Sequence, residues 1–400
     1  MQLAERMSHI GTETAFEAAA RARALEATGR SVIHLEIGEP DFDTPRHIKD
    51  AAARGLLDQG MTHYTAAEGI LPLREAIAAD VLRWKGIQAT PQQVVVTPGA
   101  KPIMFFAMLA LINEGDEVIY PNPGFPIYES MAEYVGGVAV AAPLREENDF
   151  RMDTDEVARL VTPRTRLLVI NSPHNPTGSI LTADDIRALA AIAIEHDLVV
   201  LADEIYGRLQ YEGEPLSIAT LPGMAERTIT LDGFSKTFAM TGWRLGYGII
   251  PNWLQPTYSR LVINSVSCTN AFAQAGAVAA LTGPQDEPAA FRTEFIARRE
   301  LIVAGLNAIP GVTCVMPHGA FYVFPNMSSF GRTSTEIATH LLYDGGVCAL
   351  AGTAFGRFGE GYLRFSYANS RENIAAAVER IGESLGRLER TGKLVTAAAG

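Results

Sequence analysis

Residues 228–244 read TITLDGFSKTFAMTGWR and place a lysine, Lys236, shortly after an apolar run. The run 228–231 is typical of a buried strand, and glycine, serine and aromatic residues surround the lysine that follows it. Loss of water around an amine lowers its pKa and leaves it nucleophilic, as Schiff-base chemistry requires. A lysine that reaches back to solvent from the end of a strand is the alternative reading of this segment.

The other lysines make Lys236 unusual. The chain has five lysines, and three of them, Lys49, Lys85 and Lys393, lie in polar or terminal stretches. Lys236 alone is set in an apolar stretch, so we expect its amine to be the desolvated one.

Outward from this segment, short apolar runs alternate with helical stretches. The runs lie at 94–97, 117–120, 138–142, 167–170, 198–202, 228–231 and 245–250, and the clearest helices between them at 100–112, 125–135 and 182–196. This alternation predicts an α/β fold with a seven-stranded, mostly parallel sheet between helices. Ligands of such sheets bind beyond the carboxyl ends of the strands.

The spacing of the expected helices and strands changes after residues 283–288, GPQDEP, whose glycine and prolines interrupt regular structure. A long helix to about residue 307 is expected beyond it, followed by short strands at 312–316, 320–324, 347–350 and 362–366 with helices at 333–344 and 370–389. We therefore predict a large domain over 46–285. A smaller α+β domain would combine 1–45 with 286–400.

The composition of the chain argues against several kinds of partner and binding site. A net charge of −12 argues against nucleic acid and anionic membranes as partners. Three widely spaced cysteines, Cys268, Cys314 and Cys348, fit neither a disulfide framework nor a zinc site, so we expect no metal and a cytoplasmic protein. No apolar run reaches membrane length, and the first residues do not resemble a secretory signal.

Polar residues follow several of the expected strands. The turn 97–101, TPGAK, leads into a helix whose amino end suits a phosphate, although an ordinary turn is the simpler reading. Lys101 in the first helical turn opposes the helix dipole, so we expect an anion near it. Asn175 lies in the turn-rich segment 171–178, NSPHNPTG, where it either shapes the turn or faces a ligand.

Two charged residues are embedded in apolar strands. Asp203 ends the run 199–202 and is costly to bury without a cation, unless it caps a helix. Arg364 lies inside 362–366, YLRFS, and should meet a carboxylate of the protein or of a substrate. Pyridoxal phosphate would use all of these groups together, because it needs a Schiff-base lysine, an anion at its ring nitrogen, a phosphate cradle and an aromatic face.

With these motifs the chain resembles the class I, fold-type I pyridoxal-phosphate aminotransferases, in particular the aspartate aminotransferase group of bacteria and archaea. The resemblance runs from about residue 33 to 381. It is carried by GEPDFDTP at 38–45, NSPHNPTG at 171–178, DEIY at 203–206, SKTFAMTGWR at 235–244 and RFSYA at 364–368.

The resemblance implies roles for individual residues. Lys236 would carry the cofactor as a Schiff base and act in catalysis with Asp203, which would pair with the ring nitrogen, and Tyr206. Asn175 and Tyr206 would donate to the phenolic oxygen, and Phe125 would stack on the ring. The phosphate positions would be Gly99, Ala100, Lys101, Ser235 and Arg244.

Substrate and partner roles follow from the same resemblance. Arg364 would hold the substrate α-carboxylate, with help from Gly38 and Asn175. Tyr64 resembles a tyrosine that reaches the phosphate of the neighbouring subunit, which implies a homodimer with shared sites. Lys101 corresponds to a reader of the distal carboxylate, although Pro102 after it departs from the pattern and could re-aim it.

We therefore predict an aminotransferase that moves an amino group between an L-amino acid, with aspartate-like donors favoured, and a 2-oxo acid such as 2-oxoglutarate. The mechanism would be ping-pong. An eliminase or carbon–sulfur lyase on the same scaffold is the alternative. An effector domain of a transcriptional regulator is disfavoured, because too few residues precede residue 30 for a DNA-binding module.

Overall fold

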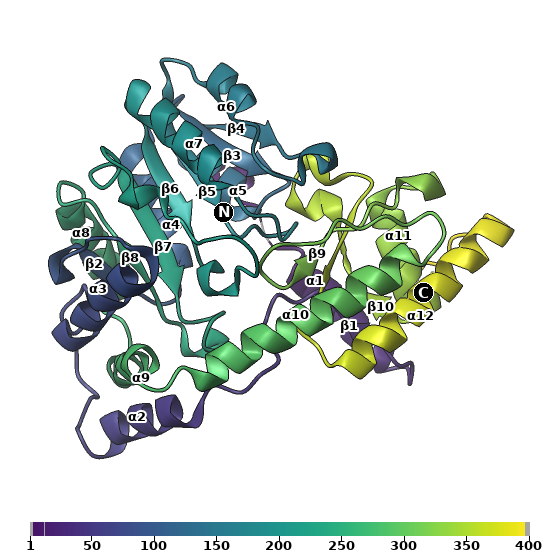
Figure 1. Cartoon of the computed structure of the whole chain (residues 1–400), viewed down its shortest axis with the longest axis horizontal. Coiled ribbons are helices and arrows are strands. Elements are labelled where there is room, and N and C mark those ends of the chain that lie inside the picture. The colour runs from purple at the N-terminus through teal and green to yellow at the C-terminus, as the bar shows by residue number, and fades with distance from the viewer. Residues whose placement is uncertain (1–2, 12, 397–400) are drawn as a thin grey trace.

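Seven strands form the central sheet of the computed structural model, which describes residues 3–11 and 13–396 (Figure 1). In sheet order they are β2 (Val94–Thr97), β8 (Gly246–Ile249), β7 (Thr228–Gly233), β6 (Val199–Asp203), β5 (Thr165–Asn171), β3 (Glu117–Asn122) and β4 (Val138–Pro143). Strand β8 runs antiparallel to both of its neighbours, and the other adjacent pairs are parallel. The predicted α/β class and mostly parallel sheet are confirmed.

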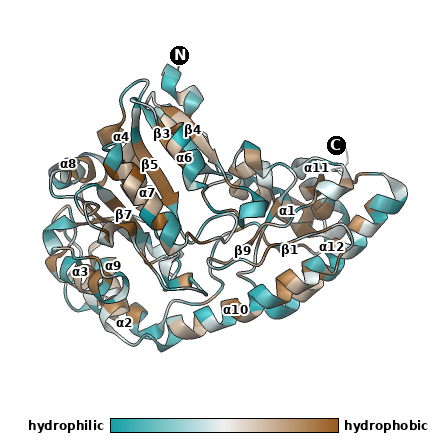
Figure 2. Cartoon of the chain, turned by 45° about the horizontal axis from the view of Figure 1, so that its top comes forward, coloured by the Kyte–Doolittle hydropathy of each residue, from teal (hydrophilic) through white to brown (hydrophobic). Residues whose placement is uncertain are grey.

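Helices cover both faces of this sheet because successive side chains of each strand point in opposite directions. Leu167 and Val169 of β5 pack into one core, and Leu168 and Ile170 into another. The first core includes residues of α4 (Lys101–Leu111), α5 (Ile127–Tyr134) and α8 (Gln255–Val266), and the second residues of α6 (Thr154–Leu160) and α7 (Ala183–Glu195). Figure 2 shows the strands of the sheet as a brown, hydrophobic layer.

The strand register gathers polar residues at one edge. Asn171 at the end of β5 is opposite Asp203 at the end of β6, and Asp203 is in turn opposite Leu231 of β7. Lys236 follows β7 by three residues, so it emerges at the same carboxyl edge. The sheet thus brings together residues that lie 65 positions apart, from 171 to 236.

A smaller α+β layer lies beside the sheet. Its strands are β11 (Leu350–Ala351), β12 (Leu363–Ser366) and β9 (Tyr322–Val323) in one antiparallel sheet, and β1 (Ile33–His34) paired with β10 (Val347–Cys348) in a parallel one. The long α10 (Asp286–Asn307) runs from α9 (Ala271–Thr282) along this layer beside α12 (Arg371–Thr391) (Figure 1). The division at residues 45 and 285 stays a prediction.

The remaining helices are α1 (Ala15–Glu26), α2 (Arg46–Leu57), α3 (Leu71–Lys85) and α11 (Ser334–His340). The expected strand at 312–316 is wrong, because within residues 3–11 and 13–396 this segment makes only a single bridge, between Thr313 and Asn326. Helix α6 was not expected, and it begins where the Asp153 carboxylate accepts a hydrogen bond from the Glu156 N–H at 3.0 Å.

The described residues contain neither a helix suited to span a membrane nor a cluster suited to bind a metal ion. Within residues 3–11 and 13–396, no helix combines the length and apolarity that a membrane span needs. The same residues hold no group of three or more histidine, cysteine or acidic side chains placed to bind a metal ion. Cys268, Cys314 and Cys348 are all free thiols.

Candidate active site

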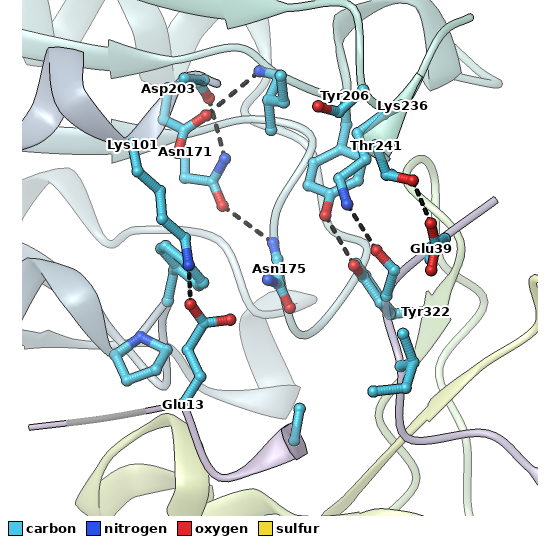
Figure 3. A pocket seen from close by; sticks show the side chains of 18 of the residues that line it. Glu13, Glu39, Lys101, Asn171, Asn175, Asp203, Tyr206, Lys236, Thr241 and Tyr322 are labelled. Carbon is cyan, nitrogen blue, oxygen red and sulfur yellow. Dashed lines mark hydrogen bonds and ion pairs between the residues drawn. The ribbon is translucent and has the colours of Figure 1, made fainter. Parts of the chain in front are cut away.

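A cavity of about 530 Å³ opens at the carboxyl edge of the large sheet, between it and the smaller layer. Among the predicted residues, Gly38, Ala100, Lys101, Phe125, Asn175, Asp203, Tyr206, Ser235, Lys236, Arg244 and Arg364 line it. Figure 3 shows how several of these side chains converge from different elements. Tyr64 does not line this cavity and is 88% exposed.

Lys236 extends into the cavity from the segment after β7 (Figure 3). Its Nζ donates to the carbonyl oxygen of Gly38 at 2.5 Å and lies 5.9 Å from the ring centroid of Tyr206. Burial is the main cause that lowers the lysine pKa to about 8, and the positive charge of Arg364 adds to it. With a pKa of about 8, roughly a tenth of this amine is neutral at pH 7 and free to act as a nucleophile or base, far more than for an ordinary lysine.

The contrast with Lys85 corrects one expectation. Lys85 is also buried, with a side chain 7% exposed, although its sequence neighbourhood is polar. Its Nζ donates to Glu204 and Asp232 at 2.7 Å each. Burial by itself lowers the pKa of Lys85, but the two carboxylates outweigh it and raise the pKa above the ordinary value. Lys85 is thus locked as an ammonium, whereas Lys236 is not.

Asp203 at the end of β6 is buried without an ion pair among the described residues. Its Oδ2 accepts from the Tyr128 hydroxyl at 2.7 Å, and its Oδ1 from the N–H of Ile205 at 3.3 Å. Burial raises the pKa of Asp203 to about 6. It caps no helix, so the alternative of a structural N-cap is excluded, and a cation in the cavity would be its natural partner.

Asn171 fixes the position of Asn175. The Asn171 Nδ2 donates to the carbonyl oxygen of Asp203 at 2.9 Å, and its Oδ1 accepts from the backbone N–H of Asn175 at 3.0 Å (Figure 3). The side-chain oxygen of Asn175 then accepts from Nη1 of Arg364 at 3.3 Å. Asn171 therefore connects the Asp203 side of the cavity with the Arg364 side.

Arg364 of β12 presents a buried guanidinium at the opposite wall. Besides Asn175, it donates from Nη2 to the carbonyl oxygen of Glu36, while its Nε has no hydrogen-bond partner in the part of the chain that the structure describes. Its guanidinium lies 4.6 Å from the ring centroid of Tyr322 and 4.9 Å from that of Phe355. Burial lowers its pKa, and no carboxylate within the described residues forms an ion pair with it.

A third corner of the cavity combines a helix start with an arginine. Helix α4 begins at Lys101 with Ala100 at its N-cap, and the alanine side chain cannot cap the free N–H groups of the first turn. Gly99 has a φ of 82°, and a Cβ there would lie 2.2 Å from Nη2 of Arg244. Arg244 is exposed and donates from Nη1 to the carbonyl oxygen of Thr241 at 2.9 Å. This corner offers donors and positive charge to an anion.

Several lining contacts were not predicted. Tyr128 supplies the hydroxyl for Asp203, and it lies three residues after Phe125 in an expected helix, a spacing that could have drawn attention to it. The hydroxyl of Tyr322 forms a hydrogen bond with that of Tyr206 at 2.7 Å. Nothing in the apolar sequence around Tyr322 indicates this contact. Glu13 pairs with Lys101 and is the anion expected beside that residue.

Comparison with known proteins agrees with this geometry. A family model described as aminotransferase class I and II matches residues 30–381. The aromatic-amino-acid aminotransferase 2 of Thermococcus litoralis is 42% identical over 358 residues, which cover 88% of this chain and 92% of that protein. The aspartate aminotransferase of Pyrococcus abyssi is 42% identical over 365 residues, covering 90% and 93%. The crystal structure of the aspartate aminotransferase from Rhizobium meliloti aligns with a TM-score of 0.92 at 37% identity, covering 97% of this chain and 99% of that one.

The chain therefore belongs to the class I and II aminotransferases and, within them, to the aspartate aminotransferase group. This family depends on pyridoxal phosphate and acts on amino acids and 2-oxo acids. The prediction of an aminotransferase on a fold-type I scaffold is confirmed. The alternative of an eliminase finds no support in the names of these relatives, which differ among themselves in substrate.

Proposed function

We propose that this cavity holds pyridoxal phosphate through the residues predicted from the sequence. The geometry fits the needs of the group. Arg244, Gly99 and the open start of α4 supply a cradle for the phosphate, and Phe125 a ring face. Asp203, buried with no cationic partner in the described part of the chain, suits a protonated ring nitrogen, and the amine of Lys236, with its lowered pKa, suits an aldehyde.

The residues of the chain then divide the chemistry of amino-group transfer. When bound, pyridoxal phosphate supplies an aldehyde that accepts the amino group and a ring that withdraws electrons. The Nζ of Lys236 removes the proton from the substrate Cα and later returns a proton during transfer. The Asp203 carboxylate would hold a proton on the ring nitrogen, and Arg364 would fix the substrate by its α-carboxylate, as the resemblance implies. Asn175 and Tyr206 would donate to the phenolic oxygen.

The observation that carries this proposal is that one cavity holds a buried arginine and a buried lysine, neither of which forms an ion pair among the described residues. Arg364 is a buried guanidinium that pairs with no carboxylate of residues 3–11 and 13–396, and Lys236 is a lysine whose pKa is about 8. A buried guanidinium is costly unless a carboxylate meets it, so the substrate would complete the site. Such a site receives an α-amino acid with its carboxylate at one end and the reacting amine within reach of the lysine.

We further propose that aspartate-like donors are favoured, with 2-oxoglutarate as an acceptor and a ping-pong order. Lys101 supports this, because its ammonium lies on the cavity wall, 5.5 Å from the ring centroid of Phe125, where a distal carboxylate could reach it. Lys101→Ala should raise the KM for aspartate by about tenfold or more and leave that for alanine nearly unchanged. Equal effects on the two donors would contradict this assignment.

The reaction class has its own test. Each proteinogenic amino acid would be added to the loaded enzyme without an acceptor, and the spectrum of the cofactor would be followed. Conversion to the pyridoxamine form, reversed by a 2-oxo acid, is the expected result. Release of ammonia and a 2-oxo acid without that conversion would favour elimination instead.

We also propose a homodimer with shared sites. Exposed apolar side chains support this, among them Leu57 on α2, 78% exposed, and Ile263 on α8, 56% exposed. Tyr64 and Arg244 are likewise exposed, as expected of residues that meet at a subunit boundary. Sedimentation should give about twice the chain mass, and Tyr64→Phe should weaken cofactor binding within an intact dimer. A monomer with full activity would contradict the proposal.

We also propose a cytoplasmic location, which the free cysteines suit.

A further inference from the structure

Glu13 and Lys101 meet across the mouth of the active-site cavity. Glu13 precedes α1, Lys101 begins α4, and both line the cavity (Figure 3). The Lys101 Nζ donates to Oε1 of Glu13, although the two residues are 88 positions apart in the chain. The Glu13 side chain is 22% exposed and that of Lys101 is 49% exposed, so water reaches the pair but does not surround it.

A carboxylate on Lys101 is the same chemical group that the proposed function brings there with a substrate. A dicarboxylic amino acid would have to take Lys101 from Glu13, and it would leave two carboxylates beside one ammonium. The two neighbouring carboxylates, one from Glu13 and one from the substrate, would repel each other. Water screens this repulsion only in part, because the site is only partly exposed. An amino acid with a neutral side chain meets no such competition, because the pair stays closed and has no net charge.

We propose that Glu13 is a specificity residue, an internal competitor for Lys101 that lowers the affinity for dicarboxylates relative to neutral amino acids. The proposal rests on the proposed function, since it takes Lys101 as the reader of a distal carboxylate. It predicts an enzyme that accepts both substrate classes in one cavity. Acidic substrates displace Glu13, and neutral ones bind with the Glu13–Lys101 pair in place.

The pair is not needed to hold the N-terminal segment, so Glu13 can be changed without loss of the fold. Ala18 and Ala22 of α1 are buried in the core that includes α7, and the Ala18 carbonyl oxygen accepts from the Cys348 thiol at 3.6 Å. Ahead of the helix, the N–H of Gly11 donates to Oγ of Ser130 at 2.7 Å. These contacts remain in Glu13→Gln.

The test measures binding of succinate, an unreactive dicarboxylate, to the enzyme loaded with pyridoxal phosphate, by calorimetry and by the cofactor spectrum. Glu13→Gln should bind succinate about 2- to 5-fold more tightly than the unmodified enzyme, the range expected when a partly exposed competing ion pair is removed. The KM for alanine should not fall. Glu17→Gln, which removes an exposed acid one turn further along α1, is the matched control and should change neither value.

Comparing these variants with Lys101→Ala separates this inference from the proposed function. In a Lys101→Ala background, Glu13→Gln should give no gain in succinate affinity, because the contested ammonium is absent. If Lys101→Ala weakens succinate but Glu13→Gln does not strengthen it, Glu13 is no competitor and the inference is overturned. If Lys101→Ala leaves succinate binding unchanged, the reader role of Lys101 fails first and the inference fails with it. Equal weakening of succinate and alanine by Glu13→Gln would also overturn it.

Discussion

Asp203→Asn should stabilise the protein without its cofactor while it damages the enzyme with it. Asp203 is 5% exposed, and its hydrogen bonds to Tyr128 and to the Ile205 N–H only partly offset the loss of water. Burial raises its pKa from the ordinary value of 3.8 to about 6. An acid whose pKa is raised by folding keeps its proton up to a higher pH in the folded protein than in the unfolded chain.

The sign and size of the effect follow from this pKa. Between pH 3.8 and about 6 the unfolded chain has lost a proton that the folded protein retains, so stability falls as the pH rises through this window. Raising the pKa of Asp203 from 3.8 to about 6 lowers the free energy of unfolding by about 3 kcal/mol at pH 7.5. Asparagine carries no charge, but its amide fits the two donors less well, which costs about 1 kcal/mol. The net gain in the free energy of unfolding should be about 1–3 kcal/mol at pH 7.5 and disappear near pH 4.

Urea unfolding of the cofactor-free protein at both pH values measures this gain. Asp184→Asn is the control, because Asp184 has a side chain 94% exposed and its loss should change stability by no more than about 0.5 kcal/mol. With cofactor present, Asp203→Asn should lower kcat by about 100-fold or more, since the ring nitrogen loses its counter-charge. A variant that is no more stable than the original protein at pH 7.5 would refute the reasoning.

Three other substitutions test separate parts of the site. Arg364→Lys should raise the KM of every amino acid by about tenfold, because one ammonium cannot replace a two-pronged donor; an unchanged KM would remove Arg364 from substrate binding. Lys85→Met should lower the free energy of unfolding by about 3–5 kcal/mol in denaturant titrations at pH 7, because two buried carboxylates lose their cation. A loss below about 1 kcal/mol would speak against that account. Gly99→Ala should weaken cofactor binding by about tenfold in a titration, since the new Cβ would strike Arg244, whereas unaltered affinity would show that this corner can adapt.

Much of the fold could be predicted because the strands are strongly apolar. Each of the seven expected runs forms a strand. Strands of a sheet that helices cover on both faces are continuous apolar runs, and such runs are easy to recognise in a sequence. The failures are segments whose local pattern is weak. The stretch 312–316 has strand-like composition but finds only one bridging partner, and α6 is short and depends on one Asp153 cap.

The site was predictable where a motif carried it and not where contacts are long-range. Lys236, Asp203 and Arg364 each follow or interrupt an apolar run, so their cost of burial is visible in the sequence. The burial of Lys85 cannot be predicted from its polar sequence neighbourhood. The two carboxylates that make its burial possible lie 119 and 147 residues away in the chain. The contact of Glu13 with Lys101 is likewise set by the tertiary fold rather than by any local pattern.

The central claim is that the amine of Lys236 binds the aldehyde of pyridoxal phosphate. The direct measurement is to load the purified chain with the cofactor, reduce the link with borohydride, and locate the modified lysine by peptide mass spectrometry. We predict one modified residue per chain, Lys236, and no stable modification or turnover in Lys236→Ala. Label on Lys85 or Lys101 instead, or steady-state transamination by Lys236→Ala, would contradict the account.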